Sequence, residues 1–441
     1  MKSSPNSYIF PLLKYIAPET LLTVSLLIWI FSILTIPTTY LYLDPMLEPV
    51  LLLVLNIFSF YLGMKVILFK VEEKRALFLV KDHFILYLSL GIGYIGTILR
   101  AYQILFQQGY LYAENNTWQR IEMASGELNS GFLGLATALT QPFGFIAFLM
   151  VIYFYQKLGW KWLLFVLPLG IYPIVEAYFT QGRLQLVKVI LMTTIVVIFF
   201  IGHHYKWVIQ LVKIKLYEYT LFKFPKKLLS FKILSVIAIA STLTYLFFIG
   251  VMEKRLSTFN YTNVIEIWEG YQEMKVDTDF KEKVLKGGNQ NIEMAKYSLK
   301  HYFAHGPIEY IKMVNHIHRP LGTYYGAYTF HPYVKFFKLF GFETPSNAEL
   351  SKILKRDSVY TTFWGPIYID FGWFSILFTF LLGAIIKHTY LRAVQGHYIH
   401  ILFYSYFGFV VFSSIFVNLL NGSSLYILNA LIILWVLKKY L

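Results

Sequence analysis

The sequence contains no cysteine and few charged residues. None of its 441 residues is cysteine, so disulfides, zinc–thiolate sites and thiol nucleophiles are excluded. Asp, Glu, Lys and Arg together make up only 14% of the chain, whereas 57% of the residues are apolar and 19% are aromatic. This composition is far from that of an ordinary soluble domain. The apolar excess indicates a membrane protein.

Motifs for nucleotides and metal ions are also missing or incomplete. The "QGR" at residues 181–183 is not followed by Rossmann or P-loop spacing. The "DTD" at residues 277–279 resembles the acidic motif of soluble glycosyltransferases, but the topology derived below puts it outside the cytoplasm, so we interpret it as a solvated turn. His301 and His305 have the spacing of metal ligands on a helix without an acidic partner. We therefore expect neither a metal ion nor a cofactor.

The chain is basic, with a formal net charge of +15. Its Lys and Arg residues are scattered between apolar runs rather than gathered on one face, which is not typical of nucleic-acid binding. Basic loops facing anionic lipid explain the charge better. The expected partner of these residues is membrane lipid, and no nucleic acid is expected.

Apolar runs of about 20 residues, the length that a helix needs to cross a bilayer, recur along most of the chain. Because backbone polar groups in lipid must be satisfied within the segment, each run is expected to be helical. The first run follows a basic N-terminus without a small-residue cleavage site, so we expect a retained span. The predicted fold class is an all-α polytopic membrane protein with about ten transmembrane helices. The expected spans are 20–42, 47–69, 84–106, 131–155, 160–179, 184–202, 231–251, 366–387, 399–419 and 423–438.

Basic residues occupy alternate loops between these spans. The loops on one side carry many Lys and Arg residues, whereas the loops 43–46, 180–183 and 420–422 on the other side contain one basic residue, Arg183. Because basic loops stay in the cytoplasm, both termini are predicted to be cytoplasmic.

This orientation leaves one large hydrophilic segment, residues 252–362, outside the cytoplasm. Patterns such as "NIEMAKYSLKHYFA" and "HGPIEYIKMVNHI" have apolar residues three and four positions apart, which is typical of amphipathic helices. We expect them to form a helical cap on the membrane surface. The predicted organisation is spans one to seven in residues 1–251, the cap in residues 252–362 and spans eight to ten in residues 363–441.

Four ionisable residues lie within or beside the spans. Arg100, Glu176, Arg183 and Lys188 all belong to the outer half of the bilayer in this topology. Charged groups in membranes are costly and frequently functional, and these four could surround one anion-binding site. The alternative is that Arg100 and Arg183 reach the lipid headgroups and that Glu176 is an ion-pair partner of one of them.

The cap contains a segment rich in polar aromatics, "VNHIHRPLGTYYGAYTFHPYVKFF". Tyrosines around an arginine suit a groove that stacks sugar rings and binds a phosphate, because a guanidinium offers two parallel donors. An aromatic loop that anchors at the membrane surface is the alternative. The candidate residues are His316, His318, Arg319, Tyr324, Tyr325, Tyr328 and His331.

The stretch "SVYTTFWGPIYIDFGWF", residues 358–374, leads from the cap into span eight. Arg356 and Tyr360 are one turn apart if this part is helical, and Gly365-Pro366 is expected to break the helix. Asp370 follows just inside the span. An unpaired carboxylate there would be costly, so Asp370 is expected to face a polar cavity or an arginine.

The combination of ten spans and a large outer loop with three stretches resembles a known family. The stretches are "QGRLQLVKVIL", "YGAYTFHPYVKFFKLFG" and "SVYTTFWGPIYIDFGWFSILFTFLLG", and the specific wording lies mainly in residues 320–384. Together they resemble the Wzy-type oligosaccharide repeat-unit polymerases of bacterial surface polysaccharide pathways. The resemblance implies a fold similar to the GT-C class of lipid-carrier-dependent glycosyltransferases and a place in the bacterial inner membrane.

Such enzymes transfer a growing glycan from undecaprenyl diphosphate to the non-reducing end of a new lipid-linked repeat unit, outside the cytoplasm. The resemblance implies lipid-linked donor and acceptor, without ATP or nucleotide sugar, and a chain-length regulator and a flippase as partners. Positive charge stabilises the leaving diphosphate, and a base accepts the proton of the acceptor hydroxyl. The candidates are Arg183, Arg319, Arg356 and Arg100 for the diphosphate, His331, His318 or Asp370 for the base, and Tyr324, Tyr325, Tyr328, Tyr360 and Trp364 for the glycan.

Two alternative functions remain at the level of sequence. The ligase that transfers finished O-antigen to lipid A has a similar layout. A flippase or secondary transporter for the same lipid-linked glycan belongs to another class. A transporter is expected to have substrate charges at mid-membrane, internal repeats and short loops, whereas this chain has charges near the outer face and a large cap.

Overall fold

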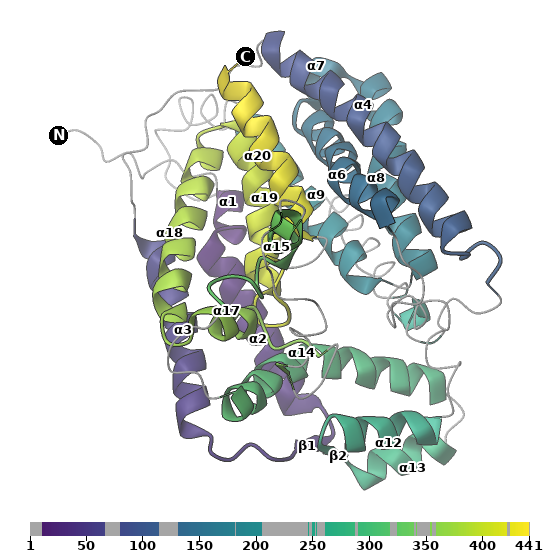
Figure 1. The fold of residues 1–441 in the computed structure, drawn as a ribbon, viewed down its shortest axis with the longest axis vertical. Helices are drawn as coiled ribbons and strands as arrows, with labels where there is room; N and C mark the ends of the chain where they lie inside the picture. The colour runs from purple at the N-terminus through teal and green to yellow at the C-terminus, as the bar shows by residue number, and fades with distance from the viewer. Residues whose placement is uncertain are drawn as a thin grey trace, which may run out of the picture.

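The computed structural model of the chain is mostly helical (Figure 1). It describes residues 11–66, 80–113, 131–180, 182–204, 246, 249–251, 253, 261–286, 290–317, 324–338, 341, 353–354, 359–420 and 424–440. A short helix, α1 (Pro11–Tyr15), precedes the first long one.

Seven of the described helices are long and apolar enough to cross a membrane. They are α2 (Pro18–Thr35), α3 (Leu47–Lys65), α4 (Val80–Tyr102) with its π-helical continuation η2 (Gln103–Gln107), α6 (Gly131–Tyr153), α8 (Trp160–Thr180), α9 (Arg183–His204) and α18 (Ser375–Val394). The short helix α7 (Tyr155–Leu158) links α6 to α8. The expectation of an all-α polytopic membrane protein is thereby confirmed.

The last two expected spans correspond to shorter helices. These are α19 (Tyr398–Ser413) and α20 (Leu425–Tyr440), each of 16 residues. The expected span at 231–251 falls almost entirely outside the described residues. The number of ten spans therefore stays a prediction.

The expected span at 366–387 is wrong in its first half. A separate helix, α17 (Trp364–Phe371), ends at Gly372, whose φ of 53° favours glycine, and α18 begins only at Ser375. Gly365-Pro366 does not break a helix, because Pro366 lies in the first turn of α17, where a backbone N–H has no helical partner to lose. The break expected at residues 365–366 thus occurs at Gly372.

Close contacts between glycines join the membrane helices. A Cβ on Gly63 of α3 would lie 2.1 Å from the carbonyl oxygen of Phe380 in α18, and a Cβ on Gly93 of α4 would lie 2.2 Å from the Cα of Gly144 in α6. Small residues allow helix backbones to approach this closely in membranes. The α3–α18 and α4–α6 pairs are therefore held by backbone contact.

Replacing Gly93 by leucine is expected to lower the stability of the protein by about 3 kcal/mol, because the side chain overlaps the backbone of α6. A Cβ on Gly91, two residues away on the same helix, would have no other atom within 4 Å. Gly91→Leu is therefore the matched control and is expected to unfold at the wild-type temperature in detergent. Equal unfolding temperatures for the two variants would contradict the close α4–α6 packing.

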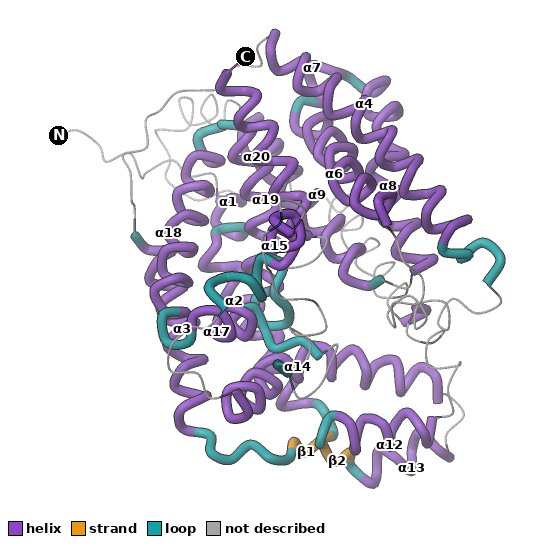
Figure 2. Tube along the Cα trace, viewed as in Figure 1, coloured by secondary structure: helices purple, strands orange, loops and turns teal. Residues whose placement is uncertain are grey.

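The cap has a hydrophobic core of its own. The cap consists of α12 (Tyr261–Tyr271), β2 (Met274–Val276), α13 (Thr278–Lys286) and the first half of α14 (Gln290–Ile317). Strand β1 (Thr38–Tyr40), which follows α2, pairs antiparallel with β2, with Thr38 opposite Val276 (Figure 2). Lys300 also donates to the carbonyl of Thr35 at 3.2 Å. The cap is therefore attached to the end of α2.

Helix α14 joins the cap to the membrane core. The sequence patterns before and after Gly306 form this single helix of 28 residues, which contains Pro307. Its second half contributes Tyr310, Met313 and Val314 to the large core of the membrane helices. Gly306 allows this contact, since a Cβ there would lie 2.6 Å from the carbonyl oxygen of Ile415.

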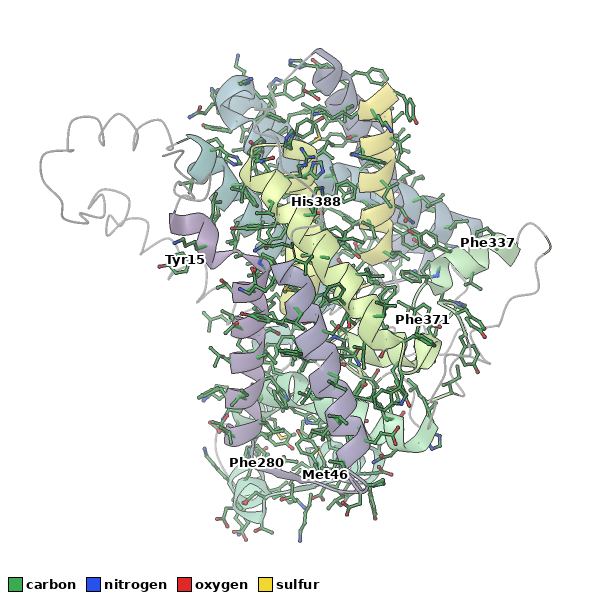
Figure 3. All side chains as sticks on the ribbon, turned by 90° about the vertical axis from the view of Figure 1, so that its left-hand side faces the viewer. Tyr15, Met46, Phe280, Phe337, Phe371 and His388 are labelled. Carbon is green, nitrogen blue, oxygen red and sulfur yellow. The ribbon has the colours of Figure 1, made fainter. Side chains whose placement is uncertain are left out.

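The cap lies at one end of the molecule. In Figure 1, α12, α13 and α14 are at the bottom and the end of α20 is at the top. In Figure 3, Phe280 of α13 and Met46, which directly precedes α3, both lie at the lower end of the molecule, whereas His388 of α18 lies far above them. In Figure 1, α2, α4 and α8 run toward the cap end, and α3, α6, α9 and α18 run away from it.

Candidate functional site

A polar cavity of about 140 Å³ lies among five membrane helices. Arg100 of α4, Glu176 of α8 and Lys188 of α9 line it together with polar residues of α6 and α20. Arg100 and Glu176 are near the ends of their helices and Lys188 is near the start of its helix. The chain directions in Figure 1 place these three parts of the helices toward the cap end. We call this the membrane cavity.

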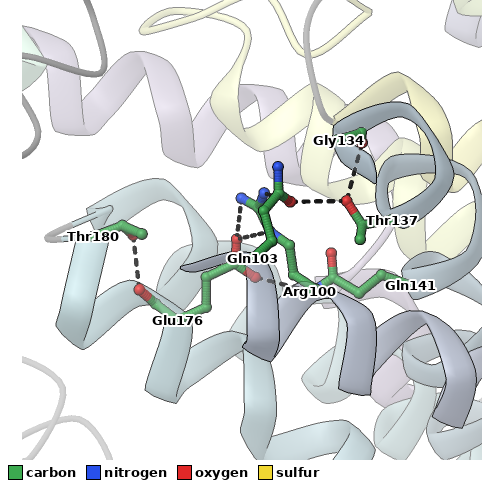
Figure 4. A network of polar contacts seen from close by, with 7 residues as sticks. All are labelled: Arg100, Gln103, Gly134, Thr137, Gln141, Glu176 and Thr180. Carbon is green, nitrogen blue, oxygen red and sulfur yellow. Dashed lines mark hydrogen bonds and ion pairs between the residues drawn. The ribbon is translucent and has the colours of Figure 1, made fainter. Parts of the chain in front are cut away.

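The guanidinium of Arg100 is already occupied by neighbouring side chains (Figure 4). Its Nε and Nη2 donate to Oε1 of Glu176 at 3.0 and 2.7 Å, and its Nη1 donates to Oε1 of Gln103 at 2.8 Å. Three of the five N–H donors of the guanidinium are thus directed at protein side chains. Arg100 acts here as the counter-ion of a buried carboxylate.

Glu176 is the centre of this network. Its side chain is buried, and its second oxygen, Oε2, accepts from Nε2 of Gln141 at 2.9 Å. Thr137 donates to the same oxygen of Gln103 that Arg100 contacts, at 3.0 Å. Charged groups in a low-dielectric interior are stable only when they are paired and hydrogen-bonded. The network satisfies both conditions for Glu176.

Lys188 differs from Arg100 in its contacts. No hydrogen bond or ion pair joins its ammonium group to another described residue. The charges of Glu176 and Arg100 nevertheless interact with it electrostatically. Its side chain lines the membrane cavity. With Arg100 and Glu176 neutralising each other, Lys188 gives the described lining a net positive charge. An anion is the ligand that this arrangement favours.

The other arginine candidates are described only in part or not at all. Arg183 is the first residue of α9, five positions before Lys188, and its side chain is not described. His318, Arg319 and Arg356 lie outside the described residues. Their roles stay predictions from the sequence.

Asp370 supports the tyrosine-rich segment of the cap. Its side chain is fully buried, and its two oxygens accept the backbone N–H groups of Tyr328 at 2.9 Å and Thr329 at 2.7 Å. Burial raises the pKa of Asp370, although these hydrogen bonds lower it. A raised pKa suits a base, but both oxygens already bind the segment 324–330. The structure thus gives Asp370 a backbone partner instead of the expected arginine or cavity.

Asp370→Asn is expected to loosen this segment, because the amide NH₂ would face a backbone N–H that needs an acceptor. The expected cost is about 2 kcal/mol, seen as faster hydrogen–deuterium exchange in a peptide covering residues 324–330. Glu282→Gln, an exposed carboxylate on α13, is the control. Unchanged exchange in Asp370→Asn would show that the carboxylate does not hold the segment.

The aromatic candidates occupy three different environments. Tyr325 is 83% exposed, Tyr324 and Tyr328 are half-buried, and Tyr360 is partly exposed beside Tyr302 and His305. Trp364 is fully buried against Phe60 and Phe363. Its ring is part of the core, so in this structure it is not available to a sugar.

His331 begins the short helix α15 (His331–Lys338), which contacts α20. The hydroxyl of Tyr333 in α15 donates to Oδ1 of Asn429 in α20. Helix α20 also contributes Tyr426 and Ile427 to the membrane cavity. A hydrogen bond thus joins the helix that begins at His331 to a helix that lines the cavity.

The other sequence motifs of the cap have structural roles in the described residues. Residues 277–279 are exposed, as expected, and Asp277 accepts the backbone N–H of Asp279 at 2.8 Å at the start of α13. His301 and His305 are buried and stack with a ring-centroid distance of 5.0 Å. No group of three metal-ligating side chains occurs among the described residues.

The neutral polar residues in and beside the membrane cavity were not predicted from the sequence. Gln141 and Tyr172 line the cavity and Gln103 binds Arg100 beside it, and all three lie within or beside apolar runs. A glutamine in an apolar run, such as Gln141 in "LATALTQPFGFIAF", is a signal that could have identified a partner for a buried charge.

Comparisons of the chain with protein-family models, with curated proteins and with solved structures found no match. The resemblance described above therefore rests on the sequence stretches alone.

Proposed function

We propose that the protein is a glycosyltransferase that polymerises undecaprenyl-diphosphate-linked oligosaccharide repeat units, with the fold of the GT-C class and ten spans. The observation that supports this best is the membrane cavity, whose described lining carries a net positive charge from Lys188 at the cap end of the helices. A lipid-linked diphosphate presents its charge near the membrane surface, where this cavity lies in the predicted orientation.

The proposed reaction is a displacement at the sugar carbon attached to the diphosphate. The acceptor hydroxyl attacks this carbon, the bond to the diphosphate oxygen breaks, and the diphosphate leaves with the bonding electrons. Lys188, with Arg183 and the arginines of the cap, would stabilise the charge on the leaving group. The acceptor proton passes to a base, for which His331, His318 and Asp370 stay the candidates.

The test is incubation of the purified protein in liposomes with its lipid-diphosphate-linked repeat unit alone, followed by a gel that resolves chain length. A ladder of products spaced by one repeat is expected, and its loss in folded Arg183→Ala and Arg319→Ala variants would support their role at the diphosphate. Movement of the lipid-linked unit between leaflets without a ladder would indicate a transporter. Transfer that requires lipid A as acceptor would indicate a ligase.

The cellular setting of the enzyme belongs to the same proposal. We infer a place in the inner membrane of a bacterium, with both termini in the cytoplasm and the cap outside it. The donor and acceptor would then both be lipid-linked oligosaccharides delivered by a flippase, with a chain-length regulator as a further partner.

A further inference from the structure

A second cavity, of about 210 Å³, lies where the cap meets the segment that leads into α17. Of the candidate residues named above, His316 lines it. Its lining comes from the loop after β1, the turn before β2, the second half of α14, and Leu354, Val359 and Thr361. The residues used below are Tyr42, Glu273, Glu309, Lys312 and Asn315. We call it the hinge pocket.

Lys312 holds the floor of the hinge pocket in place. Its buried ammonium donates to the carbonyl oxygens of Gln272 at 2.8 Å and Glu273 at 3.1 Å. The carboxylates of Glu273 and Glu309 lie 3.7 and 3.9 Å from it. These contacts fix the turn before β2 against α14, so the polar groups of the pocket are positioned before any ligand arrives.

The charge of the described lining disfavours an anionic ligand. Two carboxylates face one ammonium, so with His316 counted as neutral the described lining is net negative, and the ammonium already binds two carbonyl groups. A diphosphate would be repelled here, in contrast to the membrane cavity. No group of three His, Asp or Glu residues suited to a metal ion occurs in the described chain.

The remaining features suit a ligand with several hydroxyl groups. Carboxylate oxygens accept hydrogen bonds from hydroxyls, and an amide both donates and accepts. Asn315 donates to the carbonyl of Leu43 at 3.3 Å, which attaches it to the loop that carries Tyr42. The Tyr42 side chain is 75% exposed at the rim, where an aromatic ring offers its face to the apolar side of a sugar. The volume accommodates one sugar ring.

We propose that the hinge pocket is a binding subsite for one uncharged sugar residue of the glycan, held by Glu309 and Asn315 and covered by Tyr42. This inference rests on the proposed function, which supplies a glycan as substrate. A ligand there would touch the first outer loop, the cap and the segment before α17 together. The diphosphate of a substrate and its sugars would thus bind in two separate cavities of opposite charge.

The test is saturation-transfer NMR on the purified full chain in detergent. The probes are glucose, galactose, rhamnose and N-acetylglucosamine, with methylenediphosphonate as the anionic comparison. The variants are Glu309→Gln and Tyr42→Asn. Tyr42 has a φ of 56°, which asparagine tolerates, so the second variant removes an exposed ring without a folding penalty. Glu293→Gln, on the same helix α14 in an exposed pair with Lys283, is the matched control.

At least one sugar is expected to give a signal that falls about fivefold in Glu309→Gln and in Tyr42→Asn and is unchanged in Glu293→Gln, a loss of about 1 kcal/mol in binding. No signal from any sugar with folded wild-type protein, or a signal that persists in both pocket variants, would overturn the proposal. A diphosphonate signal lost in Glu309→Gln would overturn it as well.

These results are separable from the polymerase proposal. A sugar signal with the expected variant pattern, in a protein that makes no ladder, would support the sugar subsite and contradict the polymerase proposal. A ladder that forms in the wild type, together with no sugar signal, would support the polymerase proposal and contradict the sugar subsite.

Discussion

Replacing Lys188 by methionine is expected to slow chain extension about a hundredfold, the usual effect of removing one group that stabilises developing negative charge. Lys188 supplies the charge of the membrane cavity that Glu176 and Arg100 do not cancel. Methionine has a similar length and is apolar, so the helix packing around residue 188 should persist. The measurement is the initial rate of ladder formation from the lipid-linked repeat unit.

Lys161→Met is the control for this prediction. Lys161 lies at the start of α8 and is exposed, at the opposite end of that helix from Glu176. Its replacement removes the same charge from the protein without altering the membrane cavity, so wild-type rates are expected. Equal rates for Lys188→Met and Lys161→Met, with both proteins folded, would show that the cavity charge has no part in the reaction.

Arg100→Leu is expected to destabilise the protein by about 3–5 kcal/mol, because it leaves the buried carboxylate of Glu176 without its counter-ion. The double variant Arg100→Leu/Glu176→Leu removes both charges and should regain most of that loss. Thermal unfolding in detergent measures all three proteins. The pattern of one unstable single variant and a recovered double variant is specific for a buried ion pair.

An exposed ion pair provides the comparison. Lys286 and Glu282 lie 3.0 Å apart on α13, and both side chains are well exposed. Lys286→Leu is expected to cost less than about 1 kcal/mol. If Arg100→Leu costs no more than this, the contact with Glu176 is not structural, and Arg100 would be free to bind the diphosphate as the sequence analysis predicted.

The membrane helices were predictable because each one must satisfy its own backbone in lipid. An apolar run of about 20 residues therefore indicates a span without any knowledge of its neighbours. The exception was the stretch 364–394. Its Gly-Pro pair can either end a helix or begin one, and in the structure α17 starts there, with Trp364 buried in the core.

The charged site was predictable in its members and unpredictable in its pairing. Because charged side chains are costly within a membrane, the sequence alone identifies Arg100, Glu176 and Lys188 as candidates. Which cation neutralises Glu176 depends on the packing of α4 against α8, and 76 residues separate Arg100 from its partner. The binding of Asp370 to the backbone of Tyr328 and Thr329 was equally unpredictable, since backbone contacts leave no residue pattern.

The hinge pocket was unpredictable for a related reason. Its polar residues come from parts of the chain as far apart as Tyr42, Glu273 and Asn315. Only the pairing of β1 with β2 and the course of α14 bring these parts together. A pattern search along the chain cannot detect such a site.

The central claim is that the membrane cavity binds the diphosphate. Its most direct test is the equilibrium binding of undecaprenyl diphosphate to the purified protein, measured by native mass spectrometry. The wild type and Lys161→Met are expected to bind it equally, and Lys188→Met about tenfold more weakly, a loss of about 1.4 kcal/mol. Equal binding by all three folded proteins would contradict the assignment of the membrane cavity as the diphosphate site.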